Sequence, residues 1–77
     1  MTAQEELERL QQKIADGTMS PDEPLFVMRA QDRLAPSIVL MWASSARMAG
    51  APRDKVQEAV GLSHRMAEWA GNKKVPD

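Results

Sequence analysis

The 77-residue sequence lacks cysteine and tyrosine and contains only one phenylalanine. Without cysteine the chain has neither disulfide bonds nor a thiolate nucleophile, so a secreted disulfide scaffold is excluded and a reducing cytoplasm is the expected setting. No apolar run approaches the roughly 18 residues needed to cross a bilayer. The first 16 residues are acidic and amphipathic, unlike a signal peptide, which joins a basic segment to an apolar one. We therefore expect a cytoplasmic protein without a membrane span.

The sequence is equally poor in residues that carry catalysis. His64 is the single histidine, and its position four residues before Glu68 is explained by an ordinary pair of side chains on one helical face. No glycine-rich phosphate loop is present, and no histidine and carboxylate spacing would hold a metal. We predict that the protein is not an enzyme and uses no cofactor or metal.

Length and charge point toward binding. A chain of 77 residues forms one domain, over residues 1–77, with a core so small that association often supplies part of the burial. The net charge of −1 hides an asymmetry, because residues 1–32 carry seven acidic and three basic residues, and residues 33–77 carry seven basic and four acidic ones. This polarity suits a basic face offered to an acidic partner, although a solvated surface explains it too. We also expect a homodimer.

Three segments have the signals of α-helices, at about residues 3–16, 33–49 and 52–70. In the first, apolar residues recur at three- and four-residue intervals, Thr2 and Glu5 form a capping box, and Gly17 follows the helix. Its narrow apolar stripe has to be buried on something, because an isolated helix of this length is marginal in water. The helix could pack on the domain, pair with its copy or form a mobile arm.

The other two helices have clear starts. Asp32 can cap the N-terminal groups of the turn that follows it, Pro36 suits the first turn of the second helix, and Gly50 ends that helix. The third opens at Pro52, with Asp54 in the first turn, where the helix dipole favours an anion. Together the three helices predict an all-α fold.

The apolar residues of these helices define the expected core. Residues 38–42 make the second helix apolar almost all round, so we expect it, with Trp42, to form the centre of the core. Val56 and Met66 extend the core on the third helix. Trp69, close to the end of that helix, either completes the core or anchors an interface.

Residues 24–31 form an apolar segment that ends in a polar cluster. The apolar part favours an extended, buried conformation. Phe26 and Leu34 are expected to be buried anchors if residues 23–36 form a fixed block. For the polar part we favour an Arg29–Asp32 pair that fixes the corner before the second helix. The alternative is an exposed recognition cluster.

A second alternative is DNA binding. The small residue Ala46, the turn residue Gly50 and the corner residue Val56 resemble the core of a helix-turn-helix motif. The DNA-binding residues would then be Arg53, Lys55 and Gln57. Asp54 and Glu58 would place acids against phosphates, so a plain αα-hairpin is the favoured interpretation.

One longer pattern resembles a known group of proteins. The blocks EPLFVMRAQDRLAP, at residues 23–36, and MAEWAGNKKVPD, at residues 66–77, flank an apolar helix that contains Trp42. They are similar to short phage and prophage proteins of proteobacteria, over about residues 23–77. The resemblance implies no reaction, but it implies the setting of host-takeover factors, such as inhibitors of restriction or CRISPR effectors and regulators of phage genes.

These observations predict a small phage-encoded inhibitor of anti-CRISPR type that acts through protein contacts. The expected partner is a host protein or nucleoprotein complex in the bacterial cytoplasm. The candidate partner-binding residues are Arg29, Asp32, Arg33, Arg65, Trp69, Lys73 and Lys74. A DNA-binding regulator and a structural protein that only associates with itself are the alternatives.

Overall fold

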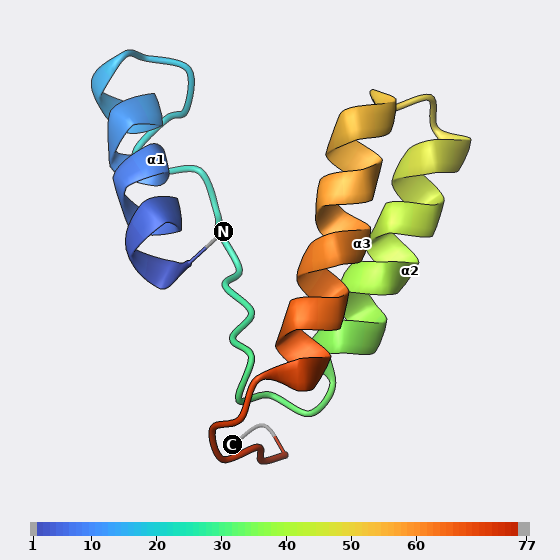
Figure 1. Ribbon diagram of the computed structural model, residues 1–77. Helices are drawn as coiled ribbons and strands as arrows, with labels where there is room; N and C mark the ends of the chain where they lie inside the picture. The colour runs from blue at the N-terminus through green and yellow to red at the C-terminus, as the bar shows by residue number, and fades with distance from the viewer. Residues whose placement is uncertain (1, 76–77) are drawn as a thin grey trace.

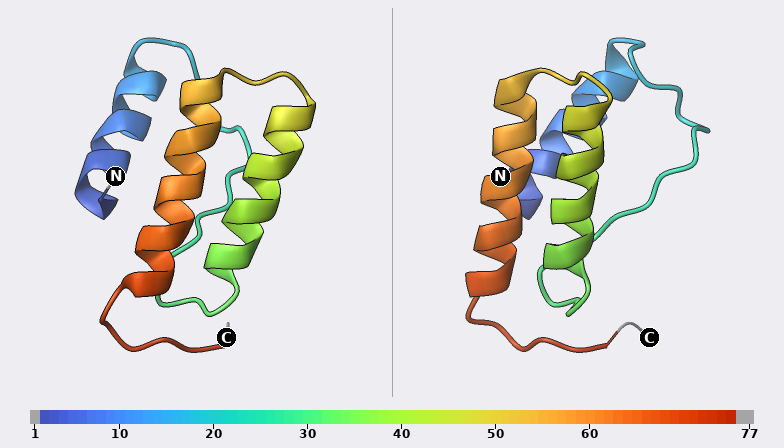
Figure 2. Two further views of the ribbon diagram at one scale, coloured as in Figure 1. Left: turned by 45° about the vertical axis from the view of Figure 1, so that its right-hand side comes forward. Right: turned by 90° about the vertical axis from the view of Figure 1, so that its right-hand side faces the viewer.

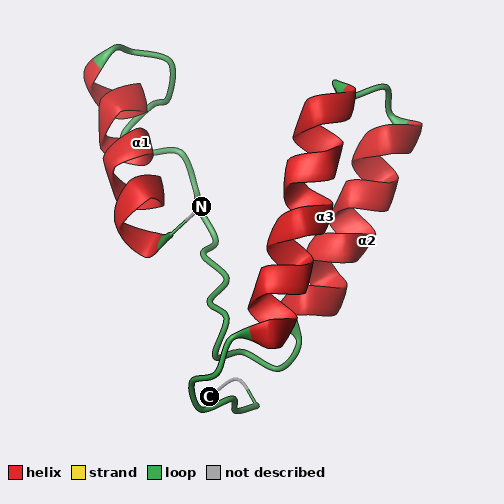
Figure 3. Cartoon of the chain, viewed as in Figure 1, coloured by secondary structure: helices red, strands yellow, loops and turns green. Residues whose placement is uncertain are grey.

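The computed structural model describes residues 2–75, so Met1 and the Pro76–Asp77 end of the C-terminal block lie outside it. It contains three helices, α1 (Ala3–Ala15), α2 (Ala35–Met48) and α3 (Arg53–Glu68), and no strand within residues 2–75. Figures 1 and 3 show two of the helices side by side and the third apart from them. The all-α prediction is confirmed, with α1 starting at the expected residue and the other five helix ends one or two residues inside those expected.

Helix α1 begins with the predicted capping box. The backbone N–H of Thr2 donates to Oε1 of Glu5 at 3.0 Å, and the backbone N–H of Glu5 donates to Oγ1 of Thr2 at 3.2 Å. Gly17 follows the helix with a φ of 82°, a conformation that glycine adopts without a steric cost. No residue of α1 is buried.

Helices α2 and α3 form an antiparallel hairpin (Figure 1). The turn between them is a Schellman motif, in which the N–H of Ala51 donates to the carbonyl of Ala46 and the N–H of Gly50 to that of Arg47. Gly50 has a φ of 87°, a conformation that favours glycine, and it follows the end of α2 as predicted. Pro36 lies in the first turn of α2, as expected.

The core lies between α2 and α3 and is small. Its buried residues are Ala35, Ala43, Val56, Ser63 and Met66. Three of the five have short side chains, which allows the two helices to approach closely. The Ser63 hydroxyl donates to the carbonyl of Val60 at 2.7 Å, so its burial leaves no donor unsatisfied.

Helix α1 stands beside α3 on the side away from α2 (Figure 2). The ion pair between them joins Arg9 of α1 to Glu58 of α3, with 3.9 Å between nitrogen and oxygen. Both side chains are partly exposed, and such pairs contribute little stability. The residues that follow α1 then run to the end of the hairpin where α2 begins and α3 ends (Figure 1).

Several burial predictions are wrong. Trp42 is 54% exposed and Phe26 is 83% exposed, and Leu34 is exposed as well. Residues 25–27 lie in neither a helix nor a strand, and they are not buried. The hairpin offers one interface, and alanines of α2 occupy its buried part, so several larger apolar residues of that helix, such as Met41, Trp42 and Met48, are exposed.

Candidate protein-binding surface

Two segments that the sequence separates meet at the end of the hairpin. An isolated parallel bridge joins Asp32 to Lys74. The N–H of Lys74 donates to the carbonyl of Gln31 at 2.7 Å, and the N–H of Arg33 donates to the carbonyl of Lys74 at 3.0 Å. The polar cluster before α2 and the basic stretch after α3 therefore form one surface. This pairing, rather than local propensity, fixes the non-helical segment before α2.

Asp32 holds this corner through the backbone and not through an ion pair. Its Oδ1 accepts the N–H of Leu34 at 2.8 Å, and its own N–H donates to the carbonyl of Arg29 at 3.0 Å. Asp32 thus caps the turn that leads into α2, as expected. The predicted Arg29–Asp32 ion pair is wrong, because the ion pairs of residues 2–75 do not include it.

Lys73 fastens the C-terminal stretch to both neighbours. Its Nζ donates to the carbonyl of Met66, near the end of α3, and to the carbonyl of Ala30 at 3.4 Å. A cation at this position complements the negative end of the helix dipole and satisfies one of the carbonyls that the helix leaves without a partner. Lys73 therefore lies where its ammonium reaches the carbonyls at the end of α3.

The side chains at this end carry an excess of positive charge. Arg29 and Arg33 are exposed, and within residues 2–75 neither guanidinium forms an ion pair. We call this surface the cationic end, and it comprises Arg29, Arg33, Trp69, Lys73 and Lys74. The described carboxylates at this end are Asp32, which is engaged as a cap, and Glu68.

Trp69 supplies the aromatic part of the cationic end. It follows the last residue of α3 in an extended conformation and is 48% exposed. Its six-membered ring lies against Gly71, where a Cβ atom would overlap the ring. Glycine at position 71 therefore makes room for Trp69 and does not end the helix with a positive φ. A half-exposed tryptophan at the end of the hairpin suits an interface anchor.

Arg65 is the one predicted partner-binding residue that the structure places elsewhere. A Cβ atom at Gly61 would lie 3.3 Å from its Nη1, so the guanidinium points back along α3. Hydrogen bonds with Thr2 are the main cause of the lowered pKa of Glu5 in α1, and the charge of Arg65 adds to this effect. Arg65 thus faces α1 and not the cationic end.

The residues of the DNA-binding alternative lie at the opposite end of the hairpin. Arg53, Lys55 and Gln57 belong to the first turns of α3 and are exposed. Lys55 lies 4.0 Å from Glu58. Helices α2 and α3 lie side by side and antiparallel (Figure 1), whereas the two helices of a helix-turn-helix cross at about 90–120°. The geometry is that of an αα-hairpin.

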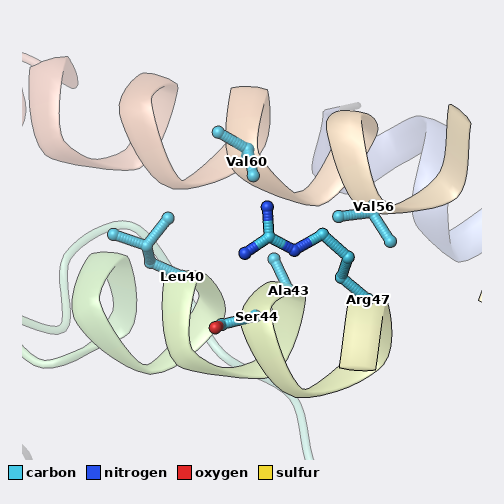
Figure 4. A pocket seen from close by; sticks show the side chains of 6 residues that line it. All are labelled: Leu40, Ala43, Ser44, Arg47, Val56 and Val60. Atoms are coloured by element: carbon cyan, nitrogen blue, oxygen red, sulfur yellow. The ribbon is translucent and has the colours of Figure 1, made fainter. Parts of the chain in front are cut away.

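A shallow groove between α2 and α3 contains a residue that the sequence analysis missed. The groove has a volume of about 260 Å³, and its lining residues are Leu40, Ala43, Ser44, Arg47, Val56 and Val60. Figure 4 shows the Arg47 side chain reaching from α2 toward Val60, so that its guanidinium lies between the two helices. The only signal for this position was its spacing of four from Ala43 and seven from Leu40.

The sequence analysis also missed the outward face of α2. Apolar side chains occur there at alternating spacings of four and three, interrupted by one serine, and we call this face the outer stripe. It comprises Leu34, Ile38, Met41, Ser45 and Met48. The four apolar members are all exposed, and Trp42 lies beside them. The spacing is visible in the sequence, but residues 38–42 form a continuous apolar run that conceals it.

The rest of the described chain offers no alternative type of site. Residues 2–75 contain no group of three histidine, cysteine or acidic residues that could hold a metal ion. None of the helices α1, α2 and α3 combines the length and apolar character needed to cross a membrane. Compared with known protein families, curated proteins and solved structures, the chain matches none at a significant level. Its function has to be inferred from its residues and their arrangement.

Proposed function

We propose that this protein is a binding protein that blocks or modulates an acidic surface on a host complex. The observation that carries the proposal is the pairing of residues 31–33 with Lys74, which gathers cations from both ends of the hairpin sequence beside Trp69. Basic side chains around a half-exposed aromatic residue supply both electrostatic attraction and an anchor. An acidic protein surface is the partner that matches them.

Binding fits the chemistry of this chain better than catalysis does. The single histidine, His64, is exposed on α3, and the groove between α2 and α3 is lined largely by apolar side chains and Arg47. A reaction site needs a nucleophile or a base held by a second group. The residues of the cationic end carry charge and hydrogen-bond donors without such a pair.

The resemblance of residues 23–77 to phage and prophage proteins suggests the biological setting. A phage protein made in the bacterial cytoplasm meets nucleoprotein complexes of host defence, and we infer that a restriction or CRISPR-type effector is the class of target. An inhibitor of this kind needs only to occupy a surface. It therefore requires no cofactor and no reaction.

An infection assay tests the proposal. The chain is expressed in bacteria that carry an active CRISPR or restriction system. These cells are then challenged with a phage that the system targets. We expect the number of plaques to rise toward that on cells without the system, while an untargeted phage is unaffected. Unchanged plaque numbers across a panel of such systems would contradict the proposal.

The DNA-binding alternative is distinguished by a gel-shift experiment. A regulator that uses Arg53 and Lys55 would shift duplex DNA with strong salt dependence, because neutralisation of phosphates dominates such binding. The proposed inhibitor leaves duplex DNA unshifted at low salt. A shift that is lost when Arg53 and Lys55 become alanine would favour the regulator instead.

A further inference from the structure

The outer stripe of α2 exposes large apolar side chains along the whole helix. Met41 is 64% exposed and Met48 is 85% exposed, and Leu34 and Ile38 continue the same face. Contiguous apolar surface on a small protein marks an interaction site more often than isolated apolar residues do. The alternating spacing of four and three residues is the pattern by which helices pair along a shared seam.

The charge pattern of this face limits what can cover it. Arg47 is the only charged residue of α2, and its guanidinium lies in the groove beside α3 (Figure 4). Within α2, the outer stripe and the residues beside it therefore bring no charge to an interface. A partner helix with charged flanks would bury them against this face without compensation, which is costly. A second copy of the same uncharged face avoids that cost.

The protein's own first helix does not cover the stripe. Helix α1 lies beside α3, where Arg9 pairs with Glu58, and Leu7 and Ile14 of α1 remain exposed. The acidic residues of α1 are also a poor match for an uncharged face.

We propose that the outer stripe binds the outer stripe of a second copy, with the two α2 helices antiparallel about a two-fold axis. In the register we infer, Met41 lies opposite Ser45 of the other copy, and Ile38 lies opposite Met48. Beside the seam, the two-fold axis places the Trp42 side chains of both copies on the same flank. Within the seam, Met41 and Ile38 each face a small or flexible side chain, as a self-complementary two-fold interface requires.

This arrangement has a consequence for the shape of the dimer. Because the cationic end adjoins the start of α2, antiparallel pairing places two cationic ends at opposite ends of the dimer. Such a dimer can bind two acidic surfaces at once. The pairing itself rests on α2 alone and does not depend on the proposed function.

Light scattering on the full chain gives the first test. We expect a mass of twice the 8.6 kDa chain at micromolar concentrations. Met41→Glu should raise the dimer dissociation constant by roughly 100-fold or more, because each copy would bury a carboxylate in the seam. Gln57→Glu adds the same charge on an exposed position of α3 and should leave the mass unchanged. A parent chain that stays at one chain mass throughout this range would overturn the proposal.

Disulfide crosslinking tests the orientation, since the parent chain has no thiol. Met41→Cys and Ser45→Cys are prepared separately, oxidised alone and as an equal mixture, and separated on a non-reducing gel. We expect a covalent dimer only in the mixture, because position 41 of one copy lies opposite position 45 of the other. Efficient crosslinking of Met41→Cys with itself would show a parallel seam and overturn the antiparallel arrangement. Loss of the dimer on Leu10→Glu would show that α1 is the true occupant.

Discussion

The backbone N–H of Arg33 donates to the carbonyl oxygen of Lys74 at 3.0 Å, and this bond joins the start of α2 to the stretch after α3. It belongs to the bridge that holds residues 31–33 in place, and it leaves the side chains of both partners outside the bond. The backbone thus fixes the position of the cationic end, while the exposed side chains of Arg29 and Arg33 form no ion pair within residues 2–75.

Lys73 is expected to hold the bridge in place. Lys73→Met keeps the aliphatic stem and removes the ammonium that donates to the carbonyls of Met66 and Ala30. The unfolding free energy should fall by about 1–2 kcal/mol, a typical loss for hydrogen bonds from a charged donor. Amide hydrogen exchange should also become faster at Arg33 and Lys74.

Lys55→Met is the matched control for Lys73→Met. Lys55 is exposed and lies 4.0 Å from Glu58, so its loss should change the unfolding free energy by less than about 0.5 kcal/mol. Equal stability of the two variants in urea titrations would show that the Lys73 contacts contribute nothing.

Gly71→Ala should displace the Trp69 ring. The new Cβ atom would overlap the six-membered ring of Trp69, so the ring has to leave its position. In a Trp42→Phe background Trp69 is the sole tryptophan, and we expect its fluorescence emission to shift to longer wavelength as the ring becomes more exposed. Ala70→Ser, at an exposed neighbouring position, should not shift the emission. An unchanged spectrum for Gly71→Ala would disprove the packing of the ring on Gly71.

Two glycines of the hairpin should respond to alanine in opposite directions. Gly50→Ala places a side chain at a φ of 87° and should cost about 1 kcal/mol of unfolding free energy. Gly61→Ala lies inside α3 and should stabilise by about 0.5–1 kcal/mol through helix propensity. The Nη1 atom that its Cβ would meet at 3.3 Å is the mobile tip of Arg65 and can move aside. Thermal melts of the two variants that shift in the same direction would contradict this assignment.

Acid should weaken the start of α1. The backbone N–H and the side chain of Thr2 lower the pKa of Glu5 from its ordinary value of 4.5. Because the folded pKa lies below the unfolded value, the cap stabilises α1 fully above a pH of about 4.5 and is lost as the pH falls through the folded pKa. An NMR titration of the Glu5 carboxyl and the Thr2 amide should show one shared transition below that value. If the Glu5 carboxyl and the Thr2 amide changed at different pH, the hydrogen bond between them would not be what the acid disrupts.

The local signals of the sequence were sufficient for the helices and their caps. Thr2 with Glu5, Gly17 and Gly50 each act within a few residues of the helix end that they define, so their roles follow from spacing alone. The exposure of Trp42 does not follow in that way. Five consecutive apolar residues cannot all face α3, and only the packed hairpin shows that Ala43 occupies the interface.

The candidate site was predictable in its residues but not in its assembly. Arg29, Arg33, Trp69 and Lys73 were identified as binding candidates in two separate parts of the chain. Their meeting depends on backbone hydrogen bonds between Gln31, Arg33 and Lys74. Such bonds use the backbone N–H and C=O groups, which every residue except proline has. No side-chain pattern in the sequence therefore predicts them.

The most direct test of the binding surface compares charge reversals at the two ends of the hairpin, in cells that carry the defence system proposed as the target of the parent chain. Arg29→Glu with Arg33→Glu alters the cationic end, and Arg53→Glu with Lys55→Glu makes the same charge change at the far end. The count of targeted phage plaques should fall at least about tenfold for the first pair, because like charges would now repel the acidic partner surface, and should stay at the parent level for the second. A first pair that still inhibits as well as the parent, or a second pair that alone abolishes inhibition, would contradict the cationic end as the binding surface.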